Sequence, residues 1–378
     1  AHGKNLAGAM RDRIMKKLTL TIGRKDTVAC DITIGYDIMD RVGLLLAKDY
    51  GKVKCVMLTD SHIASLYGEE ITRRFHNMGL AVTMITVAAG EATKNMETAL
   101  SVMKKLLELG ADRTSVIIAL GGGVIGDLAG FVASVFMRGI SYIQIPTTLM
   151  AQVDSSIGGK TAVDLPEGKN LIGTFYQPQA IYIDLKFLET LPDKEMKNGL
   201  AEIIKSGIIE DIGLFNLLEA ATKPIAERDR KILATIVEKA CRVKKGIVEM
   251  DEREKGLRRI LNFGHTLGHA LEAESHYELS HGEAVSIGMV AAARISEKLY
   301  DLPSLDRERI EALIAAIGHP TRIPPSFATE GILGRLKMDK KRVGDTIHFV
   351  LIKKIGFPFV NGGIEENILR DVIEELRS

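Results

Sequence analysis

The sequence predicts two domains: a Rossmann-like α/β domain with a mostly parallel sheet over residues 1–186, and a mainly α-helical domain over residues 187–378. Length is the first reason, because a chain of 378 residues is too long for one small core. The second is a series of short, β-branched runs in the first half, most of them separated by helical patterns. The third is an apolar period of about 3.6 residues, which dominates from Leu191 and Pro192 onward.

The first half contains the runs that predict a sheet. Nearly continuous apolar strands are typical of a sheet whose two faces are both covered by helices. Residues 5–18 predict a short amphipathic helix ahead of the sheet, and residues 96–110 are typical of the helices between strands. The predicted strands are residues 29–35, 53–60, 81–87, 115–120, 142–146 and 180–184.

The second half is predicted to be helical over residues 197–209, 231–248 and 286–300. Residues 347–352 are the exception and predict a strand or hairpin near the end of the chain. Neither an internal repeat nor a low-complexity linker separates the halves. We therefore expect the domains to pack closely, with the active site in the cleft between them.

Composition limits the class of protein. Apolar residues make up 46% and charged residues 26% of the sequence, which is typical of globular proteins. The formal net charge of +1 provides no global field for nucleic acid or an acidic membrane, and no apolar run reaches the roughly 18 residues of a membrane span. Cys30, Cys55 and Cys241 are far apart, which favours free thiols in a reducing compartment. We expect a cytoplasmic protein without nucleic-acid or membrane partners.

Residues 261–283 concentrate three histidines and predict a metal site. His265 and His269 are spaced i, i+4, which places both rings on one face of a helix, and His281 follows after a helix-length interval. Three protein ligands and one open position are typical of catalytic zinc. Glu202, three residues before Lys205 on a predicted helix, is a candidate carboxylate ligand. The spacing does not choose the ligands, and one or two of these histidines could instead cap a helix end.

A glycine-rich segment, GGGVIGDLAGFVAS, directly follows the predicted strand at 115–120. Gly121, Gly123 and Gly126 match the GxGxxG pattern, in which glycines let the backbone approach a diphosphate at a helix N-terminus. The acidic residue expected about 20 positions later is absent, but Asp60 at the end of an earlier strand can replace it. We favour a dinucleotide loop over the alternative of a tight turn.

Basic residues in apolar or glycine-rich sequence predict an anionic substrate. A buried cation is costly without an anionic partner, and a phosphate or carboxylate would supply one. Residues 158–161 imitate the end of a Walker A loop, but position 154 is Asp rather than Gly, which excludes a nucleotide triphosphatase. Several basic residues, such as Lys160 and Lys205, lie in apolar or glycine-rich sequence. The full set gathers around polar loop positions and consists of Arg138, Lys160, Lys169, Lys205, Lys244 and Arg258.

From about Asp60 to Gly356, the chain closely resembles the 3-dehydroquinate synthases. The motifs that carry the resemblance are GGGVIGDLAGFVAS, RGI, IPTTLMAQVDSSIGGKTAVDLPEGKNLIG, FYQPQAIYID, NGLAEIIKSG, LNFGHTLGHALE, SHGEAVSIGM and MDKKR. The resemblance implies a dehydroquinate synthase-like fold that uses NAD and zinc, with cobalt as a possible substitute for zinc.

Position by position, the resemblance implies zinc ligands, cofactor contacts and a substrate pocket. The zinc ligands are Glu202, His265 and His281, whereas His269 lies on the substrate side and Glu283 is not a ligand. The cofactor contacts are Asp60, Glu91, Lys94, Gly121, Gly122, Gly123, Asp127, Thr147, Thr148, Lys160, Lys169 and Thr190. The catalytic and substrate residues are Asp154, Lys160, Asn170, Lys205, Lys244, Arg258, Asn262, His269 and Lys341, for which Lys340 is an alternative. Arg138 matches an arginine contributed by the partner subunit, which implies a homodimer.

The implied reaction converts 3-deoxy-D-arabino-heptulosonate 7-phosphate to 3-dehydroquinate and phosphate, within the shikimate pathway of aromatic amino acid biosynthesis. It combines transient oxidation of C5 by NAD, β-elimination of phosphate, re-reduction, ring opening and aldol closure, and zinc polarises the hydroxyl that is oxidised. His269 and Lys205 would serve proton transfer and orientation. Most of the catalysis would be positioning and charge stabilisation.

Three alternatives stay open on the sequence. Sister enzymes cyclise other sugar phosphates to 2-deoxy-scyllo-inosose or valiolone-type products, but KTAVDLPEGKNLIG together with Arg258 and Asn262 matches the dehydroquinate type. Glycerol and metal-dependent alcohol dehydrogenases share the two-domain plan, but they do not need the cluster of cations. A degenerate, non-enzymatic homologue is the third, and burial of Glu202 or Lys160 without a function argues against it.

Overall fold

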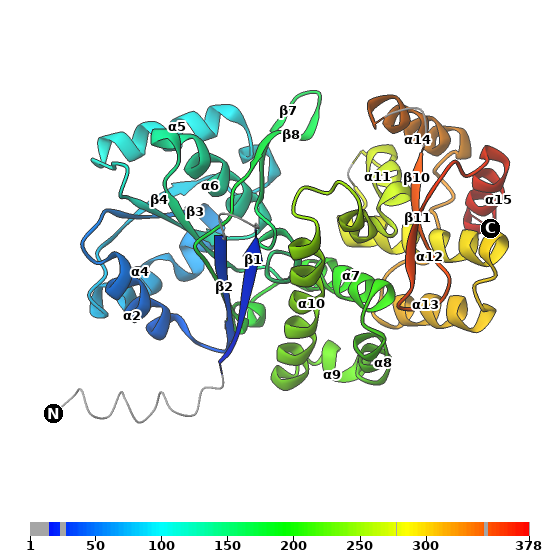
Figure 1. The fold of residues 1–378 in the computed structure, drawn as a ribbon, viewed down its shortest axis with the longest axis horizontal. Helices are drawn as coiled ribbons and strands as arrows, with labels where there is room; N and C mark the ends of the chain where they lie inside the picture. Colours follow the sequence, from blue (N-terminus) through cyan, green and yellow to red (C-terminus); the bar gives the residue numbers. More distant parts are fainter. Residues whose placement is uncertain (1–14, 23–27, 277, 344–346, 378) are drawn as a thin grey trace. The chain divides into compact units, whose positions relative to one another are not determined.

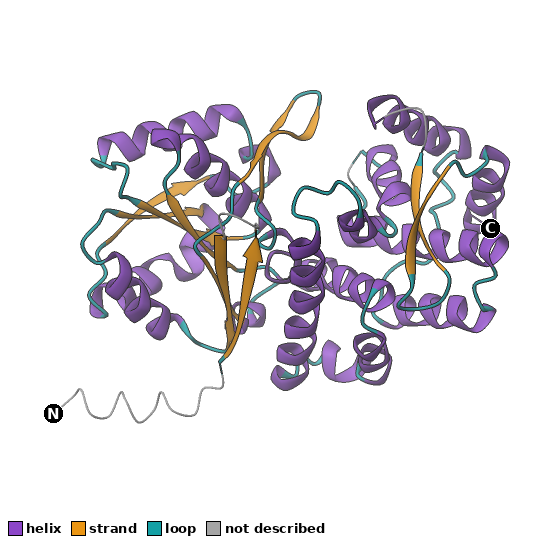
Figure 2. Ribbon diagram, viewed as in Figure 1, coloured by secondary structure: helices purple, strands orange, loops and turns teal. Residues whose placement is uncertain are grey.

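A computed structural model describes residues 15–22, 28–276, 278–343 and 347–377 (Figure 1). The chain divides between Leu191 and Pro192 into two compact units. Strands are concentrated in the first unit and helices dominate the second, as Figure 2 shows. The predicted fold class, a mostly parallel α/β part followed by a mainly helical part, is confirmed.

The first unit is built on a seven-stranded sheet with the order β1-β2-β9-β6-β5-β3-β4. β1 pairs antiparallel with β2, and every other neighbouring pair in this sheet is parallel. All the strands predicted in the first half are present. The strands are β1 (Lys16–Ile22), β2 (Val28–Gly35), β3 (Cys55–Asp60), β4 (Val82–Val87), β5 (Val116–Gly121), β6 (Ser141–Pro146) and β9 (Ala180–Asp184).

The helix predicted over residues 5–18 is wrong where the structure describes it, because Lys16 to Leu18 belong to β1. Leu18, Leu20 and Ile22 alternate with exposed or half-buried residues, as a strand with one buried face requires. Residues 5–14 lie outside the described residues.

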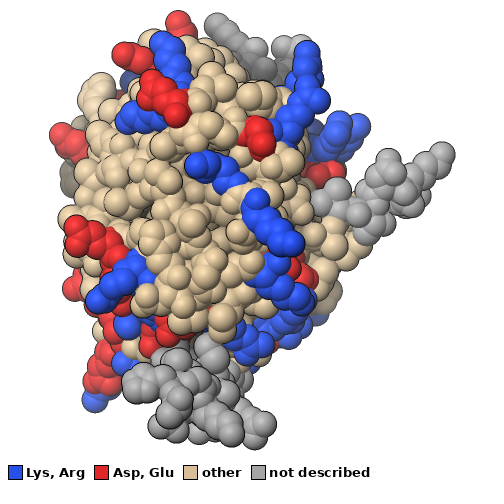
Figure 3. All heavy atoms as spheres, turned by 90° about the vertical axis from the view of Figure 1, so that its left-hand side faces the viewer, with Lys and Arg blue, Asp and Glu red and all other residues tan. Residues whose placement is uncertain are grey.

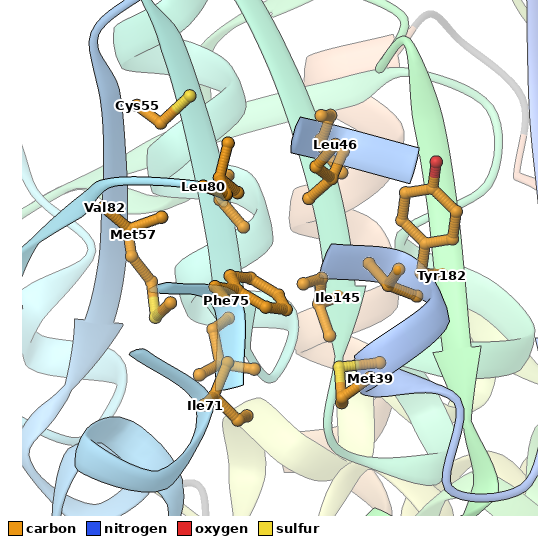
Figure 4. Packing of buried hydrophobic residues seen from close by; sticks show 14 of the residues in the cluster. Met39, Leu46, Cys55, Met57, Ile71, Phe75, Leu80, Val82, Ile145 and Tyr182 are labelled. Carbon is orange, nitrogen blue, oxygen red and sulfur yellow. The ribbon is translucent and has the colours of Figure 1, made fainter. Parts of the chain in front are cut away.

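Two hydrophobic cores cover the two faces of the sheet. Successive residues of β3 alternate between them: Cys55 and Met57 point to one core, Val56 and Leu58 to the other. Figure 4 shows the first core, in which Met39 and Leu46 of α2 and Phe75 of α4 pack on the sheet. The second core contains residues of α5 and α6. The helices of this unit are α2 (Met39–Tyr50), α3 (Ser61–Ile63), α4 (Glu69–Asn77), α5 (Met96–Glu108) and α6 (Gly123–Val135).

Short helical turns and one hairpin complete the first unit. β7 (Lys160–Leu165) and β8 (Gly168–Phe175) form an antiparallel hairpin that the sequence did not predict. Every residue of β8 is exposed or half-buried, so the strand lacks the apolar run that marks the other strands. The turns are η1 (Ala64–Gly68), η2 (Glu91–Thr93), η3 (Phe136–Arg138), η4 (Ala151–Ser155) and η5 (Leu185–Glu189).

The second unit is helical apart from one hairpin. β10 (His348–Ile352) and β11 (Pro358–Gly362) pair antiparallel, which confirms the strand predicted over residues 347–352. The helices are α7 (Asp193–Ile209), α8 (Ile212–Ala220), α9 (Thr222–Ala226), α10 (Arg230–Met250), η6 (Leu257–Asn262), α11 (His265–Glu274), α12 (His281–Tyr300), α13 (Ser304–Ala316), α14 (Thr329–Val343) and α15 (Glu366–Arg377).

The surface shows charges of both signs. Figure 3 presents one face of the molecule, on which Lys and Arg are interspersed with Asp and Glu around uncharged surface. This mixture agrees with the formal net charge of +1. Within the described ranges, none of the helices combines the length and apolar character needed to cross a membrane.

Candidate functional site

The glycine loop joins β5 to α6 at the carboxyl end of the parallel sheet. A Cβ on Gly121 would lie 2.7 Å from Cβ of Ile125, and a Cβ on Gly122 would lie 3.1 Å from Cγ2 of Thr148. A Cβ on Gly123 would approach Oγ of Ser155 to 3.0 Å. No side-chain hydrogen bond caps the N-terminus of α6, and a helix end of this kind suits an anionic group. This narrow turn and open helix end fit the diphosphate of a dinucleotide.

A charged cluster centred on Lys94 lies in the same unit. The Lys94 side chain is only 6% exposed, and its Nζ lies 3.1 Å from Oδ2 of Asp127 and 3.4 Å from Oε1 of Glu91. Nζ also donates a hydrogen bond of 2.6 Å to Oδ1 of Asn170. Lys169 joins the cluster through an ion pair of 3.8 Å with Glu91. The structure thus brings together five site residues predicted from three separate motifs.

Burial and charge shift the pKa values in this cluster. Burial raises the pKa of Asp127 to about 6, although the charge of Lys94 opposes the shift. For Lys94, burial alone would lower the pKa, but Asp127, Glu91 and Asp164 together raise it. Lys94 is therefore a permanent cation among carboxylates.

Asp164 belongs to this cluster and was missed by the sequence analysis. Its Oδ1 lies 3.8 Å from Nζ of Lys94 and accepts a hydrogen bond of 2.7 Å from the backbone N–H of Asn170. Asn170 has a left-handed φ of 58°, so this hydrogen bond helps to hold its strained backbone. Asp164 occupies an irregularity in the β7–β8 register, and no sequence motif marked that position.

The other predicted cofactor contacts lie at the ends of elements in the first unit. Oδ1 of Asp60 caps α3 by accepting hydrogen bonds from the backbone N–H groups of His62 and Ile63. Thr147 donates its backbone N–H to the carbonyl oxygen of Gly121. Oγ1 of Thr148 accepts the N–H of Ala151, and Oγ1 of Thr190 contacts the hydroxyl of Tyr67.

Three predicted substrate residues of the first unit have exposed or half-buried side chains. Lys160 begins β7 and is exposed, so the expectation that it is buried is wrong. Arg138 is also exposed, on a turn where Met137 and Arg138 both have left-handed φ values, of 51° and 67°. Asp154 lies half-buried in η4.

The candidate metal centre lies in the second unit, where three helices each supply one residue. Glu202 lies on α7 and is 2% exposed, whereas His265 and His281 are the first residues of α11 and α12. Their donor atoms all lie within 4.8 Å of one another. Nε2 of His265 and Nε2 of His281 lie 3.5 and 3.3 Å from the same oxygen, Oε1 of Glu202.

The electrostatics of this triad suit a divalent ion. Burial alone would raise the pKa of Glu202, but Lys205 and the two histidines outweigh it and hold the pKa well below its ordinary value. Burial and Lys205 keep the pKa of His265 well below 6.5, so its ring is neutral. Despite burial, Glu202 and Glu272 raise the pKa of His281 to about 10. An ionised carboxylate and two imidazoles fit zinc or a similar ion, which would displace the proton of His281.

His269 lies beside the triad rather than within it. It is exposed, and its ring centroid lies 5.3 Å from that of His265. Donor atoms of His269, Glu272 and His281 also lie within 4.8 Å of one another, so the histidine stretch contains two overlapping groups that could hold an ion. The buried Glu202 favours the first group.

Buried cations accompany the candidate metal centre. Lys205 is buried and ion-paired with Oε2 of Glu202, while Lys244 and Arg258 are also buried. Arg258 donates to the carbonyl oxygen of Glu252, and Asn262 donates a hydrogen bond of 2.8 Å to Glu254. The side chains of Lys340 and Lys341 lie outside the part of the chain that the structure describes.

Two further residues fix the start of α12. Oδ1 of Asn198 accepts the N–H of Gly282 at 3.0 Å, and Asn198 lies one helical turn before Glu202 on α7. Glu283 forms a capping box with Ser280, which is consistent with its exclusion as a metal ligand. The spacing of Asn198 and Glu202 within NGLAEIIKSG was the available signal for this contact.

Comparison with protein families agrees with this geometry. Residues 84–198 match a family model described as 3-dehydroquinate synthase N-terminal, and residues 199–342 match one described as 3-dehydroquinate synthase C-terminal. The chain belongs to the 3-dehydroquinate synthase family. A relative named 3-dehydroquinate synthase from Caulobacter vibrioides is 43% identical over 354 residues, which cover 92% of this chain and 96% of that one. The predicted resemblance is confirmed.

Solved structures of sugar phosphate cyclases share the fold. A 2-deoxy-scyllo-inosose synthase complexed with carbaglucose-6-phosphate, NAD+ and Co2+ is 27% identical, covers 96% of this chain and 100% of its own, and has a TM-score of 0.86. A 2-epi-5-epi-valiolone synthase from Streptomyces hygroscopicus with NAD+ and Zn2+ bound is 26% identical, covers 94% and 98%, and has a TM-score of 0.84. Their likeness in fold exceeds their likeness in sequence.

Proposed function

We propose that the protein is a 3-dehydroquinate synthase, a phosphorus–oxygen lyase that converts 3-deoxy-D-arabino-heptulosonate 7-phosphate to 3-dehydroquinate and phosphate. The observation that carries the proposal is the meeting of Glu202, His265 and His281 in a chain whose relatives bear that name. The glycine loop at the end of β5 supports it, because the reaction also needs a dinucleotide.

NAD is the proposed dinucleotide, and when bound it would supply reversible hydride transfer. Gly121, Gly122 and Gly123 would receive its diphosphate, because a side chain at each would meet Ile125, Thr148 or Ser155. Around them, the proposed contacts are Asp60, Glu91, Lys94, Asp127, Thr147, Thr148, Lys160, Lys169 and Thr190. The solved cyclases with NAD+ bound support the choice of cofactor.

Zinc is the proposed metal, with cobalt as an alternative. When bound, the ion would polarise the substrate hydroxyl that is oxidised. Glu202, His265 and His281 would hold it. The buried Lys205 neutralises the second oxygen of Glu202 and so limits the negative charge of the ligand set. The solved cyclases with Co2+ and Zn2+ support the same choice of ions.

Buried cations of the second unit would bind the anionic ends of the substrate. Lys244 and Arg258 are both buried in the second unit, and the resemblance assigns both to the substrate pocket. Lys205 and His269 would orient the substrate and move protons beside the metal. The further proposed substrate contacts are Arg138, Asp154, Lys160, Asn170, Asn262 and Lys341.

Within this proposal, residues 1–186 bind NAD and residues 187–378 bind the metal, and both serve one substrate. We also propose a homodimer in which Arg138 completes the partner's site, which accords with its exposure on a strained turn. The cytoplasm is the proposed location, since Cys30, Cys55 and Cys241 are buried, free thiols.

The test combines two readings in one reaction. Purified protein is mixed with the heptulosonate phosphate and NAD, with and without a chelator, while released phosphate and NADH absorbance are followed together. Phosphate release without lasting NADH, abolished by chelation, is the expected result. Lasting NADH without phosphate release would instead indicate a net dehydrogenase.

A sister cyclase is the second candidate, favoured by the TM-score of 0.86 to 2-deoxy-scyllo-inosose synthase. The same assay with the sugar phosphates of the sister enzymes separates the two candidates. Turnover with those substrates and none with the heptulosonate phosphate would overturn the proposed function.

A further inference from the structure

We infer that Glu272 is a positioning residue that holds the His281 ring with Nε2 directed at the metal. The inference rests on the proposed function, because it concerns the zinc-binding group of the same site. Glu272 is not one of the three proposed ligands. Its role would be exerted on the ring of His281 and not on the ion itself.

The two nitrogens of His281 face two different carboxylates. Nε2 lies 3.3 Å from Oε1 of Glu202, and Nδ1 lies 3.3 Å from Oε1 of Glu272. A neutral imidazole carries one proton, and an ionised carboxylate can only accept one. When the N–H at Nδ1 donates a hydrogen bond to Glu272, Nε2 carries a lone pair on the side of Glu202.

His265 shows the same arrangement with a different acceptor. Its Nδ1 lies 3.2 Å from the carbonyl oxygen of Phe263, and its Nε2 lies 3.5 Å from Oε1 of Glu202. A carbonyl oxygen is also an obligate acceptor, so this ring is held in the same tautomer. Both histidines therefore direct Nε2 at one point, and each has an outer partner that fixes it.

Helix geometry explains why Glu272 can reach His281. Glu272 follows His265 by seven residues on α11, which places both side chains on one face two turns apart. α11 packs closely on α12, where a Cβ on Gly288 would lie 1.9 Å from the carbonyl oxygen of Gly264. Asn198 and the capping box hold the backbone at the start of α12. Glu272 instead contacts the ring of His281.

The competing role for Glu272 is that of a direct ligand. Its donor oxygen groups with His269 and His281 in the second candidate set, which could take an additional ion. The contact of 3.3 Å joins Glu272 to Nδ1 of His281, whereas Nε2 of the same ring faces Glu202. Glu272 therefore contacts the ring nitrogen that does not face the ion, as a hydrogen-bond partner of a metal ligand does. Glu272 is 13% exposed on its side chain, which protects this hydrogen bond from water. The number of bound ions separates the two roles.

The experiment measures zinc affinity and stoichiometry in metal-stripped Glu272→Ala, Glu272→Gln and Glu274→Gln proteins by competition with a chelating dye. Glu274 is the matched control, because it lies on the same helix but pairs with Arg335 at 3.3 Å. We expect Glu272→Ala to weaken zinc binding about 10–100-fold at one ion per chain. Glu272→Gln should lose less, because its amide oxygen still accepts a hydrogen bond, and Glu274→Gln should match the wild type.

Cobalt substitution provides a second reading that a merely structural role would not change. The visible absorption of the Co2+ protein should shift in Glu272→Ala and recover in Glu272→Gln, since the ring orientation alters the ligand field. Unchanged zinc affinity and spectrum in folded Glu272→Ala would overturn the inference. Loss of a second zinc with the first retained would also overturn it and make Glu272 a ligand.

His281→Ala separates this inference from the proposed metal site. If His281→Ala loses zinc while Glu272→Ala retains it, only the positioning role is wrong. If His281→Ala binds zinc as the wild type does, the metal site itself is wrong and the inference falls with it. Should Glu272→Ala fail to fold, the graded affinity of Glu272→Gln against Glu274→Gln still decides the question.

Discussion

At the scale of single residues, His281 is the part of the candidate metal site most open to a test. Its Nε2 lies 3.3 Å from Glu202, whose carboxylate is 2% exposed. We expect His281→Ala to lose at least about tenfold in zinc affinity, because a site with two protein ligands is below the usual three. The measurement is zinc content after dialysis against a metal buffer, with phosphate release as the parallel reading. Full zinc occupancy and full activity would refute the assignment.

Asp127 gives the first unit a pH dependence of definite sign. Burial raises its pKa from 3.8 to about 6, so the folded state binds this proton more tightly than the unfolded state. Between pH 4 and 6 the unfolded chain has lost the proton and the folded chain still holds it, so stability falls as pH rises. This one group lowers the free energy of unfolding by at most about 1.4 kcal/mol for each unit by which the pH rises.

The measurement for Asp127 is the free energy of unfolding of the wild type and of Asp127→Asn from pH 4 to 8, by urea titration. The stability of Asp127→Asn relative to the wild type should increase from pH 4 to about 6 and then stay constant. Parallel curves across this range would show that the carboxyl group has an ordinary pKa in the folded protein.

The contacts of single residues were predictable only where a motif named them. The resemblance supplied Glu202, His265 and His281, which are separated in sequence but whose donor atoms lie within 4.8 Å. Asp164 could not be predicted, because its contact with Lys94 depends on how the β7–β8 hairpin folds back on η2. Glu272 was within a recognised motif, but its role depends on the orientation of one ring.

At the scale of elements, the close packing of α11 on α12 should depend on Gly288. A Cβ there would lie 1.9 Å from the carbonyl oxygen of Gly264, which is backbone and cannot move aside as a side chain would. We expect Gly288→Ala to destabilise the protein by about 1–3 kcal/mol or more and to weaken zinc binding, because both helices begin with a proposed ligand.

Gly246 on α10 is the matched control for Gly288. A Cβ at Gly246 meets nothing within 4 Å, so alanine there should add roughly 0.5–1 kcal/mol through its higher helix propensity. Urea unfolding of both variants gives the comparison. Equal free energies of unfolding for the two variants would show that α11 and α12 can move apart to accept the Cβ at position 288 with no loss of stability.

The strands that the sequence predicts best are those whose residues are most deeply buried. β3 and β5 are buried on both faces and appear in the sequence as continuous apolar runs. β1 alternates Leu18, Leu20 and Ile22 with polar residues, which is the period of a strand and not that of the helix predicted over residues 5–18. β8 has no buried residue and gives neither signal, so only the structure shows the hairpin.

At the scale of the whole molecule, the proposed homodimer would place Arg138 of each subunit in the active site of its partner. Arg138 lies exposed on a turn with two left-handed residues, which is a strained conformation. Lys205 is buried beside Glu202 in the second unit. If Arg138 serves the partner's site, two variants that are each inactive should restore one another.

Arg138→Ala and Lys205→Ala proteins are therefore unfolded together, refolded as an equal mixture and assayed for phosphate release. Random pairing makes half of the dimers mixed, and each mixed dimer has one site with an intact Lys205 of its own and an intact Arg138 from its partner. The expected rate is about a quarter of the wild-type rate. An Arg138 that acts within its own subunit leaves every site of every dimer defective, so a mixture as inactive as its components would reject the shared site. Wild-type protein refolded in the same way is the control, because it measures how much activity the procedure itself removes.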